Sequence, residues 1–272
     1  MIQDIYPSRL DNSFACHEIR EADTLICFDK DGRLLVDVQS GAIRFPDGKF
    51  AASVRNIYAF SIDDKRYFIA LSELHAADSA YVYRTLRELR DSFCGNELFA
   101  AFTAYHLWKW YNDSAYCGRC GKELVFHESE RAMRCPECGN IIYPRINPAV
   151  IVGVVKGDSI LITRYRRGYV HNALVAGFTE IGETLEQTVE REVMEETGVK
   201  VKNIRYYKSQ PWGMAQDMLV GFFCEADGSG EIHMDENELR YAEWVKREDI
   251  VLQPNNASLT NEMMKVFKVG KV

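Results

Sequence analysis

A glycine turn followed by a helix dense in carboxylates is the stretch that most constrains what this chain can fold into. It covers residues 177–199, and Thr184 and Gln187 have the spacing of a capping box at a helix start. Gly198 stands where helices commonly end on a left-handed glycine. The apolar residues that recur every four positions predict the buried stripe of the helix: Leu185, Val189 and Val193.

Three glutamates crowd one side of this helix. Glu192, Glu195 and Glu196 stand at i, i+3 and i+4, and like charges at this spacing repel. At 3.6 residues per turn Glu196 falls in the sector of the buried stripe, where a carboxylate needs a compensating cation. We expect Arg191 to neutralise one carboxylate, that of Glu183, but not all of them.

The remaining cation is predicted to be a hard divalent metal bound through oxygen, Mg²⁺ or Mn²⁺. The alternative is a solvated acidic helix face. Such faces usually interleave lysine at i+4, and none is present here.

The spacing of this stretch, G-x5-E-x7-R-E-V-x-E-E-x-G-V, resembles the Nudix box at every fixed position. The resemblance implies a hydrolase that splits the diphosphate of a nucleoside diphosphate linked to another group. It also implies an α/β class fold, a Nudix α/β/α sandwich on a mixed sheet.

Four cysteines ahead of the box have the spacing of a zinc site. They form two knuckles, C-x2-C-x14-C-x2-C, each followed by glycine: Cys117, Cys120, Cys135 and Cys138. Four thiolates in a tetrahedral array select Zn²⁺ and leave no open position, so a structural role is expected. The alternative is two unrelated cysteine pairs.

A zinc ribbon can also bind nucleic acid, and this one carries several cations. These are Arg119, Lys122, Arg131 and Arg134, offset by Glu123, Glu128, Glu130 and Glu137. The balance favours structural scaffolding.

The length of 272 residues suits two domains, or one with an insertion. We expect an N-terminal α/β domain at 1–111, a zinc ribbon at 112–144 and a Nudix domain at 145–272. In the first domain the pattern predicts a hairpin over 24–38, a strand at 66–71 and a helix at 83–90. His17 and His75 are isolated and are interpreted as ordinary side chains.

Residues 97–111 read as a helix rich in aromatic residues. Phe99, Phe102, Tyr105 and Trp108 fall near one face. Aromatic residues at helical spacing usually belong to a core. A stacking platform for bases is the alternative.

A zinc ribbon ahead of the box, with Ser209-Gln210-Pro211-Trp212 soon after it, narrows the resemblance to the NADH pyrophosphatase (NAD⁺ diphosphatase) subfamily. Members cleave NAD(H) to nicotinamide mononucleotide and AMP, some also remove NAD caps from RNA, and they are typically homodimers. The resemblance implies metal ligation by Glu192, Glu196, Glu238 and the carbonyl of Ala176. Glu195 would be a ligand or a water-activating base, and Arg191 would orient Glu183.

The same resemblance assigns substrate contacts. Tyr143 and Phe178 would sandwich the nicotinamide, from one subunit or from opposite ones. Further lining would come from the segment after the box and from the last helix: Gln210, Pro211, Trp212, Gly213, Met214, Ala215, Gln216, Asp217 and Thr260.

The chain departs from the family pattern S-Q-P-W-P-F-P-x-S after Trp212. Gly213-Met-Ala-Gln-Asp217 lacks two prolines and a phenylalanine, and Asp217 places a negative charge where serine is usual. Tyr241 and Thr260 replace a glutamate and an alanine. None of these changes touches the metal ligands, but each could alter which dinucleotide fits, and Met214 could serve as a flexible wall.

A net charge of −7 argues against bulk binding to nucleic acid or to an anionic membrane. We find no apolar run long enough for a membrane helix and no basic and apolar start typical of a signal peptide, so a cytoplasmic enzyme is expected. Other readings are hydrolysis of ADP-ribose, of dinucleoside polyphosphates or of NAD-capped RNA, a non-enzymatic nucleotide sensor, and a nucleic-acid module.

Overall fold

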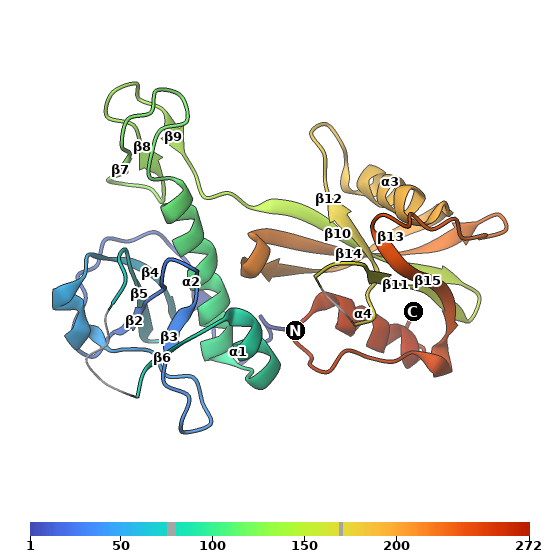
Figure 1. Cartoon of the computed structure of the whole chain (residues 1–272), viewed down its shortest axis with the longest axis horizontal. Coiled ribbons are helices and arrows are strands. Elements are labelled where there is room, and N and C mark those ends of the chain that lie inside the picture. The colour runs from blue at the N-terminus through green and yellow to red at the C-terminus, as the bar shows by residue number, and fades with distance from the viewer. Residues whose placement is uncertain (75–79, 169–170) are drawn as a thin grey trace. The chain divides into compact units, whose positions relative to one another are not determined.

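The structure is a computed structural model that describes residues 1–74, 80–168 and 171–272, so His75 lies outside the described residues. The chain divides into two compact units, each with its own core. One unit comprises Met1, 147–211 and 217–272, and the other comprises 2–146 and 212–216. We call them the C-terminal unit and the N-terminal unit; Figure 1 labels their elements.

The C-terminal unit is built on a mixed six-stranded sheet. Its strands are β10 (Asn147–Lys156), β11 (Ser159–Tyr165), β12 (Val175–Phe178), β13 (Lys200–Trp212), β14 (Asp217–Asp227) and β15 (Leu239–Lys246). The order is β13-β14-β10-β11-β15, and β12 also pairs with β10. The β10–β14 pair is parallel, whereas β11 and β12 run antiparallel to β10.

One helix covers each face of this sheet (Figure 1). Val150, Val152 and Val154 of β10 share a core with α3 (Leu185–Thr197). Ile151, between them, shares the opposite core with α4 (Leu259–Lys268). Successive side chains of a strand point to opposite faces, so the centre of β10, residues 149–154, is buried on both sides and contains only apolar residues and glycine. The predicted α/β/α sandwich is confirmed.

The N-terminal unit contains a four-stranded sheet and a two-stranded one. The first has the order β1 (Leu10–Asp11), β4 (Asn56–Ile62), β5 (Lys65–Ala70), β2 (Thr24–Ile26), and the second pairs β3 (Leu34–Val36) with β6 (Val82–Arg84). A 3₁₀ helix, Gly48–Ser53, lies between β3 and β4. The strand predicted at 66–71 is β5, but the helix predicted at 83–90 begins only at α1 (Leu86–Ser92).

The predicted hairpin over 24–38 is wrong in its pairing. The chain does turn back on itself, with one bridge between Phe28 and Leu34. However, β2 pairs with β5 in parallel and β3 pairs with β6. Partners distant in sequence therefore decide the pairing of both strands.

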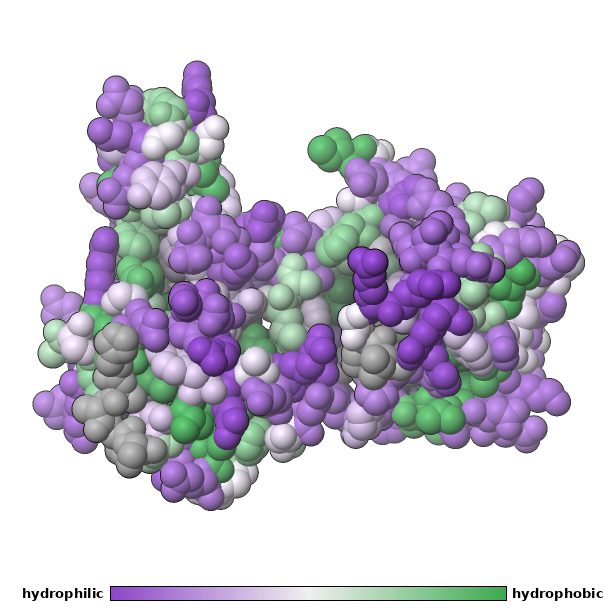
Figure 2. Space-filling view, viewed as in Figure 1, coloured by the Kyte–Doolittle hydropathy of each residue, from purple (hydrophilic) through white to green (hydrophobic). Residues whose placement is uncertain are grey.

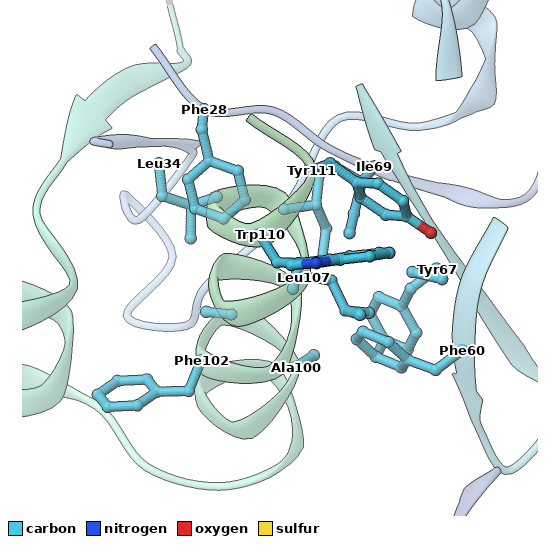
Figure 3. Close-up of a cluster of buried hydrophobic side chains, with 14 of the residues drawn as sticks. Phe28, Leu34, Phe60, Tyr67, Ile69, Ala100, Phe102, Leu107, Trp110 and Tyr111 are labelled. Atoms are coloured by element: carbon cyan, nitrogen blue, oxygen red, sulfur yellow. The ribbon is translucent and has the colours of Figure 1, made fainter. Parts of the chain in front are cut away.

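The long helix α2 (Asn96–Asp113) organises the core of the N-terminal unit. Figure 3 shows Leu107 and Trp110 of α2 in this core, together with Phe60 and Tyr67 of the neighbouring strands. Of the predicted aromatic stripe, Phe99 and Phe102 are buried, whereas Tyr105 and Trp108 are half-buried.

The cysteine-rich segment forms a small three-stranded sheet of β7 (Val125–Phe126), β8 (Met133–Arg134) and β9 (Ile141–Ile142). Two further 3₁₀ helices are Gly213–Ala215 in the N-terminal unit and Arg247–Asp249 in the C-terminal unit. Over the described ranges, no helix is both long and apolar enough to span a bilayer.

Candidate functional site

Helix α3 places the predicted acidic residues, and its ends form as the sequence indicates. Both bonds of the capping box are present, from Gln187 N to Thr184 Oγ1 (3.2 Å) and from Thr184 N to Gln187 Oε1 (2.8 Å). Gly198 ends the helix with a φ of 69°. Of the predicted buried stripe, Val189 and Val193 are fully buried, whereas Leu185 is half-buried. The surface over α3 is mostly hydrophilic (Figure 2).

Glu196 is the buried member of the acidic set, only 2% exposed. Its carboxylate accepts a hydrogen bond from the hydroxyl of Tyr165 (3.2 Å), and that hydroxyl accepts one from the backbone N–H of Ala176 (3.1 Å). Burial raises the pKa of Glu196 to about 8; the Tyr165 hydrogen bond opposes this rise, and the charges of Glu192 and Glu238 add to it. Sequence reasoning missed Tyr165, because no local pattern marks the last residue of β11 as a partner of α3.

Arg191 gathers the other carboxylates of the site. Its guanidinium donates to Glu183 Oε1 (2.5 Å), Glu192 Oε1 (2.8 Å), Glu195 Oε2 (3.0 Å) and the carbonyl of Phe178 (2.9 Å). The hydrogen bond from Arg191 lowers the pKa of Glu183 to about 2. The expected pairing with Glu183 is present, and two further glutamates share the same cation. Among the described contacts, none joins Arg191 to Glu196.

Glu192 lies directly against the backbone of β12. A Cβ added at Gly177 would come within 1.9 Å of the Glu192 carboxyl carbon, so only glycine leaves room for this side chain. Burial raises the pKa of Glu192, and Arg191 opposes the rise. Glu238 is exposed, yet its charge raises the pKa of both Glu192 and Glu196, so all three carboxylates lie within electrostatic reach of one another.

These residues fit a divalent cation. Glu196 is a buried carboxylate with no cationic partner among the described residues, although buried charges are normally paired. The surrounding donors are oxygens: the carboxylates of Glu192 and Glu238, and the carbonyl of Ala176. Such a set suits a hard cation rather than a soft one.

The four cysteines of the ribbon fit one zinc ion. Their Sγ atoms all lie within 4.8 Å of one another, and no other cysteine, histidine or carboxylate cluster in the described ranges is so tight. Backbone N–H groups of Arg119 and Cys120 lower the pKa of Cys117, which favours the thiolate that binds zinc. The predicted structural zinc site is therefore supported.

Residues 212–216, at the end of β13 and after it, pack against the N-terminal unit. The side chains of Trp212 and Met214 pack against the core of the N-terminal unit, and Trp212 lies 5.2 Å from Phe102 between ring centroids. A Cβ at Gly213 would come within 2.0 Å of the Phe102 carbonyl oxygen. The close approach of α2 therefore explains why glycine follows Trp212.

The remaining predicted substrate residues lie in different surroundings. Gln210 is fully buried, and its amide joins the backbone of Ala257 (2.8 Å) and Leu259 (2.6 Å) at the start of α4. Pro211 is half-buried at the end of β13, Thr260 is half-buried on α4, and Ala215 is exposed. Gln216 is buried and accepts a hydrogen bond from Arg145 (2.5 Å).

Asp217 opens β14 opposite Asn147 and is 5% exposed. Burial raises the pKa of its carboxyl to about 7. Within the described part of the chain, its Oδ1 atom has no hydrogen-bond partner. At slightly acidic pH the carboxyl group of Asp217 is therefore mainly protonated and neutral.

The two predicted nicotinamide contacts belong to different units. In the C-terminal unit, Phe178 is 52% exposed and borders a cavity of about 320 Å³ with Asn147, Pro148 and Thr179. In the N-terminal unit, Tyr143 is exposed and donates a hydrogen bond to Glu130 (2.8 Å).

Family models match both the carboxylate-bearing domain and the cysteine ribbon. The family model described as NUDIX domain matches residues 145–267. The chain has a Nudix domain. The model described as NADH pyrophosphatase zinc ribbon domain matches residues 112–143, so the Nudix domain follows a ribbon of that family, as the sequence predicted.

Curated relatives and solved structures agree with the Nudix assignment. The chain is 46% identical over 159 residues to proteins named NAD-capped RNA hydrolase NudC from Escherichia coli O1:K1 and from strain SMS-3-5. These matches cover 57% of this chain and 61% of each relative's length. A NUDIX hydrolase from Nitrosomonas europaea has a similar fold, with a TM-score of 0.50 and 19% identity over 57% of this chain and 92% of that one.

Proposed function

We propose that this chain hydrolyses the diphosphate bond of NAD(H), giving nicotinamide mononucleotide and AMP, with Mg²⁺ or Mn²⁺. The observation that carries the proposal is the buried carboxylate of Glu196, which lacks a cationic partner among the described residues and lies beside Glu192 and Ala176. The NADH pyrophosphatase type of zinc ribbon ahead of the Nudix domain supports the choice of substrate.

We assign each step of this reaction to residues of the chain. Glu192, Glu196, Glu238 and the Ala176 carbonyl would hold the metal. A bound Mg²⁺ or Mn²⁺ neutralises phosphate charge and lowers the pKa of water. Glu195, the exposed end of the Arg191 network, or Glu238 accepts the proton of the attacking water. Arg191 keeps the turn carrying Glu183 against the helix, and Phe178 offers its ring to the nicotinamide.

The test is Glu196→Gln, which keeps the shape of the side chain but removes its charge. We expect turnover of NADH to fall by about 100-fold or more, because one metal-holding oxygen is lost. Glu190→Gln, an exposed change on the same helix, is the matched control and should leave turnover unchanged. Products from NADH, NAD⁺ and ADP-ribose should be identified by mass. Near-normal activity of Glu196→Gln would contradict the proposed site.

NAD-capped RNA is the second candidate substrate, because the relatives named above are called NAD-capped RNA hydrolases. Release of nicotinamide mononucleotide from a capped RNA, compared with free NADH under the same conditions, separates the two. We also infer a homodimer in the cytoplasm, on the resemblance alone, and light scattering of the purified protein tests the dimer. Hydrolysis of ADP-ribose without NADH would instead indicate that the segment ending at Asp217 changes the substrate.

A further inference from the structure

A cavity in the N-terminal unit has no part in the proposed reaction. It has a volume of about 560 Å³ and lies between α2, the ribbon and two residues next to strand ends, Arg55 before β4 and Leu71 after β5. We call it the α2–ribbon cavity. Its wall includes three aromatic rings, those of Trp108, Tyr111 and Phe126, and two cationic side chains, those of Arg55 and Lys122. Its volume lies within the range of small-molecule sites.

A smaller cavity of about 220 Å³ adjoins it. The two share Arg55, Tyr111 and Phe126, so Arg55 borders both. The guanidinium carbon of Arg55 lies 4.9 Å from the centre of the Phe126 ring. No ion pair holds Arg55 in the described part of the chain, and its charge is therefore available to an anion.

A second guanidinium lies near the smaller cavity, in less exposed surroundings. Arg131 donates to the side chain of Asn12 (2.6 Å) and to the carbonyl of Ala59 (2.6 Å), both neutral acceptors. In the sequence it lies between Glu130 and Ala132, two residues of the wall of the smaller cavity. Among the described residues no carboxylate pairs with it, so a partly buried positive charge remains uncompensated.

Aromatic faces beside the Arg55 guanidinium match the chemistry of a nucleotide. A base can stack on the rings, and a phosphate can accept charge-assisted hydrogen bonds from arginine. Among the described residues that line the larger cavity, Glu123 is the one carboxylate, and two cations accompany it. The partial exposure of Trp108 also agrees with the stacking platform that the sequence left open.

We propose that the α2–ribbon cavity binds a nucleotide, with the base against Trp108, Tyr111 or Phe126 and the phosphate at Arg55. This site shares no residue with the proposed diphosphate-cleaving site. The nucleotide is either a free mononucleotide or one residue of a single-stranded RNA.

The experiment measures binding to the full-length chain by calorimetry, with AMP and a 5′-phosphorylated hexa-adenylate as probes. Glu196→Gln is the background, so that metal-dependent cleavage does not interfere. Arg55→Gln is compared with Arg87→Gln, a matched change at an exposed arginine of α1 outside the cavity. Arg55→Gln should weaken the binding of at least one probe about tenfold or more, and Arg87→Gln should not.

The probe affected identifies the source of the nucleotide. Loss of AMP binding indicates a free mononucleotide, and loss confined to the hexa-adenylate indicates RNA. Equal binding by the two arginine variants for both probes overturns the proposal, as does equal competition by inorganic phosphate, which has no base to stack. Hydrolysis of NADH by Arg55→Gln in the otherwise native chain should remain normal, so failure here is distinguishable from failure of the proposed hydrolase activity.

Discussion

Replacing Gly177 by alanine should remove Glu192 from the metal site while leaving the fold intact. The added Cβ would come within 1.9 Å of the Glu192 carboxyl carbon and within 2.2 Å of both of its oxygens. Gly177 has no positive φ, so alanine introduces no backbone strain. The atoms that must move are the end of a flexible side chain, which can rotate away from β12.

The cost to stability can be worked from the contact that breaks. Rotation of Glu192 gives up its 2.8 Å hydrogen bond to Arg191, a pair with side chains 26% and 13% exposed. A hydrogen bond between charged groups contributes about 1.5–3 kcal/mol, and partial exposure to solvent reduces this to about 1–2 kcal/mol. The melting temperature should therefore fall by several degrees only. Loss of a carboxylate from the site should lower Mn²⁺ affinity and NADH turnover by about 100-fold.

The assay is a Mn²⁺ titration followed by electron paramagnetic resonance, with calorimetric melting and NADH turnover on the same samples. Gly118→Ala is the matched control, because a Cβ there meets nothing within 4 Å. Undiminished Mn²⁺ affinity in Gly177→Ala, with the melting temperature of the native chain, would refute the placement of Glu192.

Three further changes test other contacts. The Tyr165 hydroxyl joins Ala176 to Glu196, and its hydrogen bond lowers the pKa of Glu196. Tyr165→Phe removes this hydroxyl, so Mn²⁺ binding should weaken about 10-fold or more and shift to higher pH. Unchanged binding would argue against this role. Asp217 has a pKa of about 7, above its unfolded value of about 3.9, so the native state holds the extra proton and the free energy of unfolding should fall as pH rises from 4 to 7. In Asp217→Asn the free energy of unfolding should no longer fall with pH, so that from pH 4 to pH 8 the variant gains about 2–4 kcal/mol in this free energy relative to the native chain. Urea unfolding with chelator measures both chains, and parallel pH profiles would contradict this. Cys135→Ser should abolish stoichiometric zinc by atomic absorption and destabilise the ribbon, and retained zinc would exclude the four-thiolate site.

Local patterns predicted much of this structure. The caps of α3 and the spacing of the zinc knuckles depend on residues close in sequence, and both are found as expected. The acidic cluster could be predicted because Glu196 falls on the apolar side of its own helix. In each case the residues that interact in the structure are also close together in the sequence.

What could not be predicted depends on distant partners. The pairing of β2 with β5 joins segments about forty residues apart, and no pattern near residues 24–26 selects it. The hydroxyl of Tyr165 reaches Glu196 only because β11, β12 and α3 meet. Both ends of the Gln210 amide bind backbone near α4, and these contacts also join segments far apart in the sequence.

The short segment 212–216 has a consequence for how the chain is made. Its flanks, 147–211 and 217–272, belong to the C-terminal unit, whereas Trp212 and Met214 pack against the core of the N-terminal unit. During synthesis from the N-terminus, the first 146 residues therefore leave the ribosome before these two side chains exist. The N-terminal unit gains their contacts only after residues in the middle of the C-terminal unit have been translated.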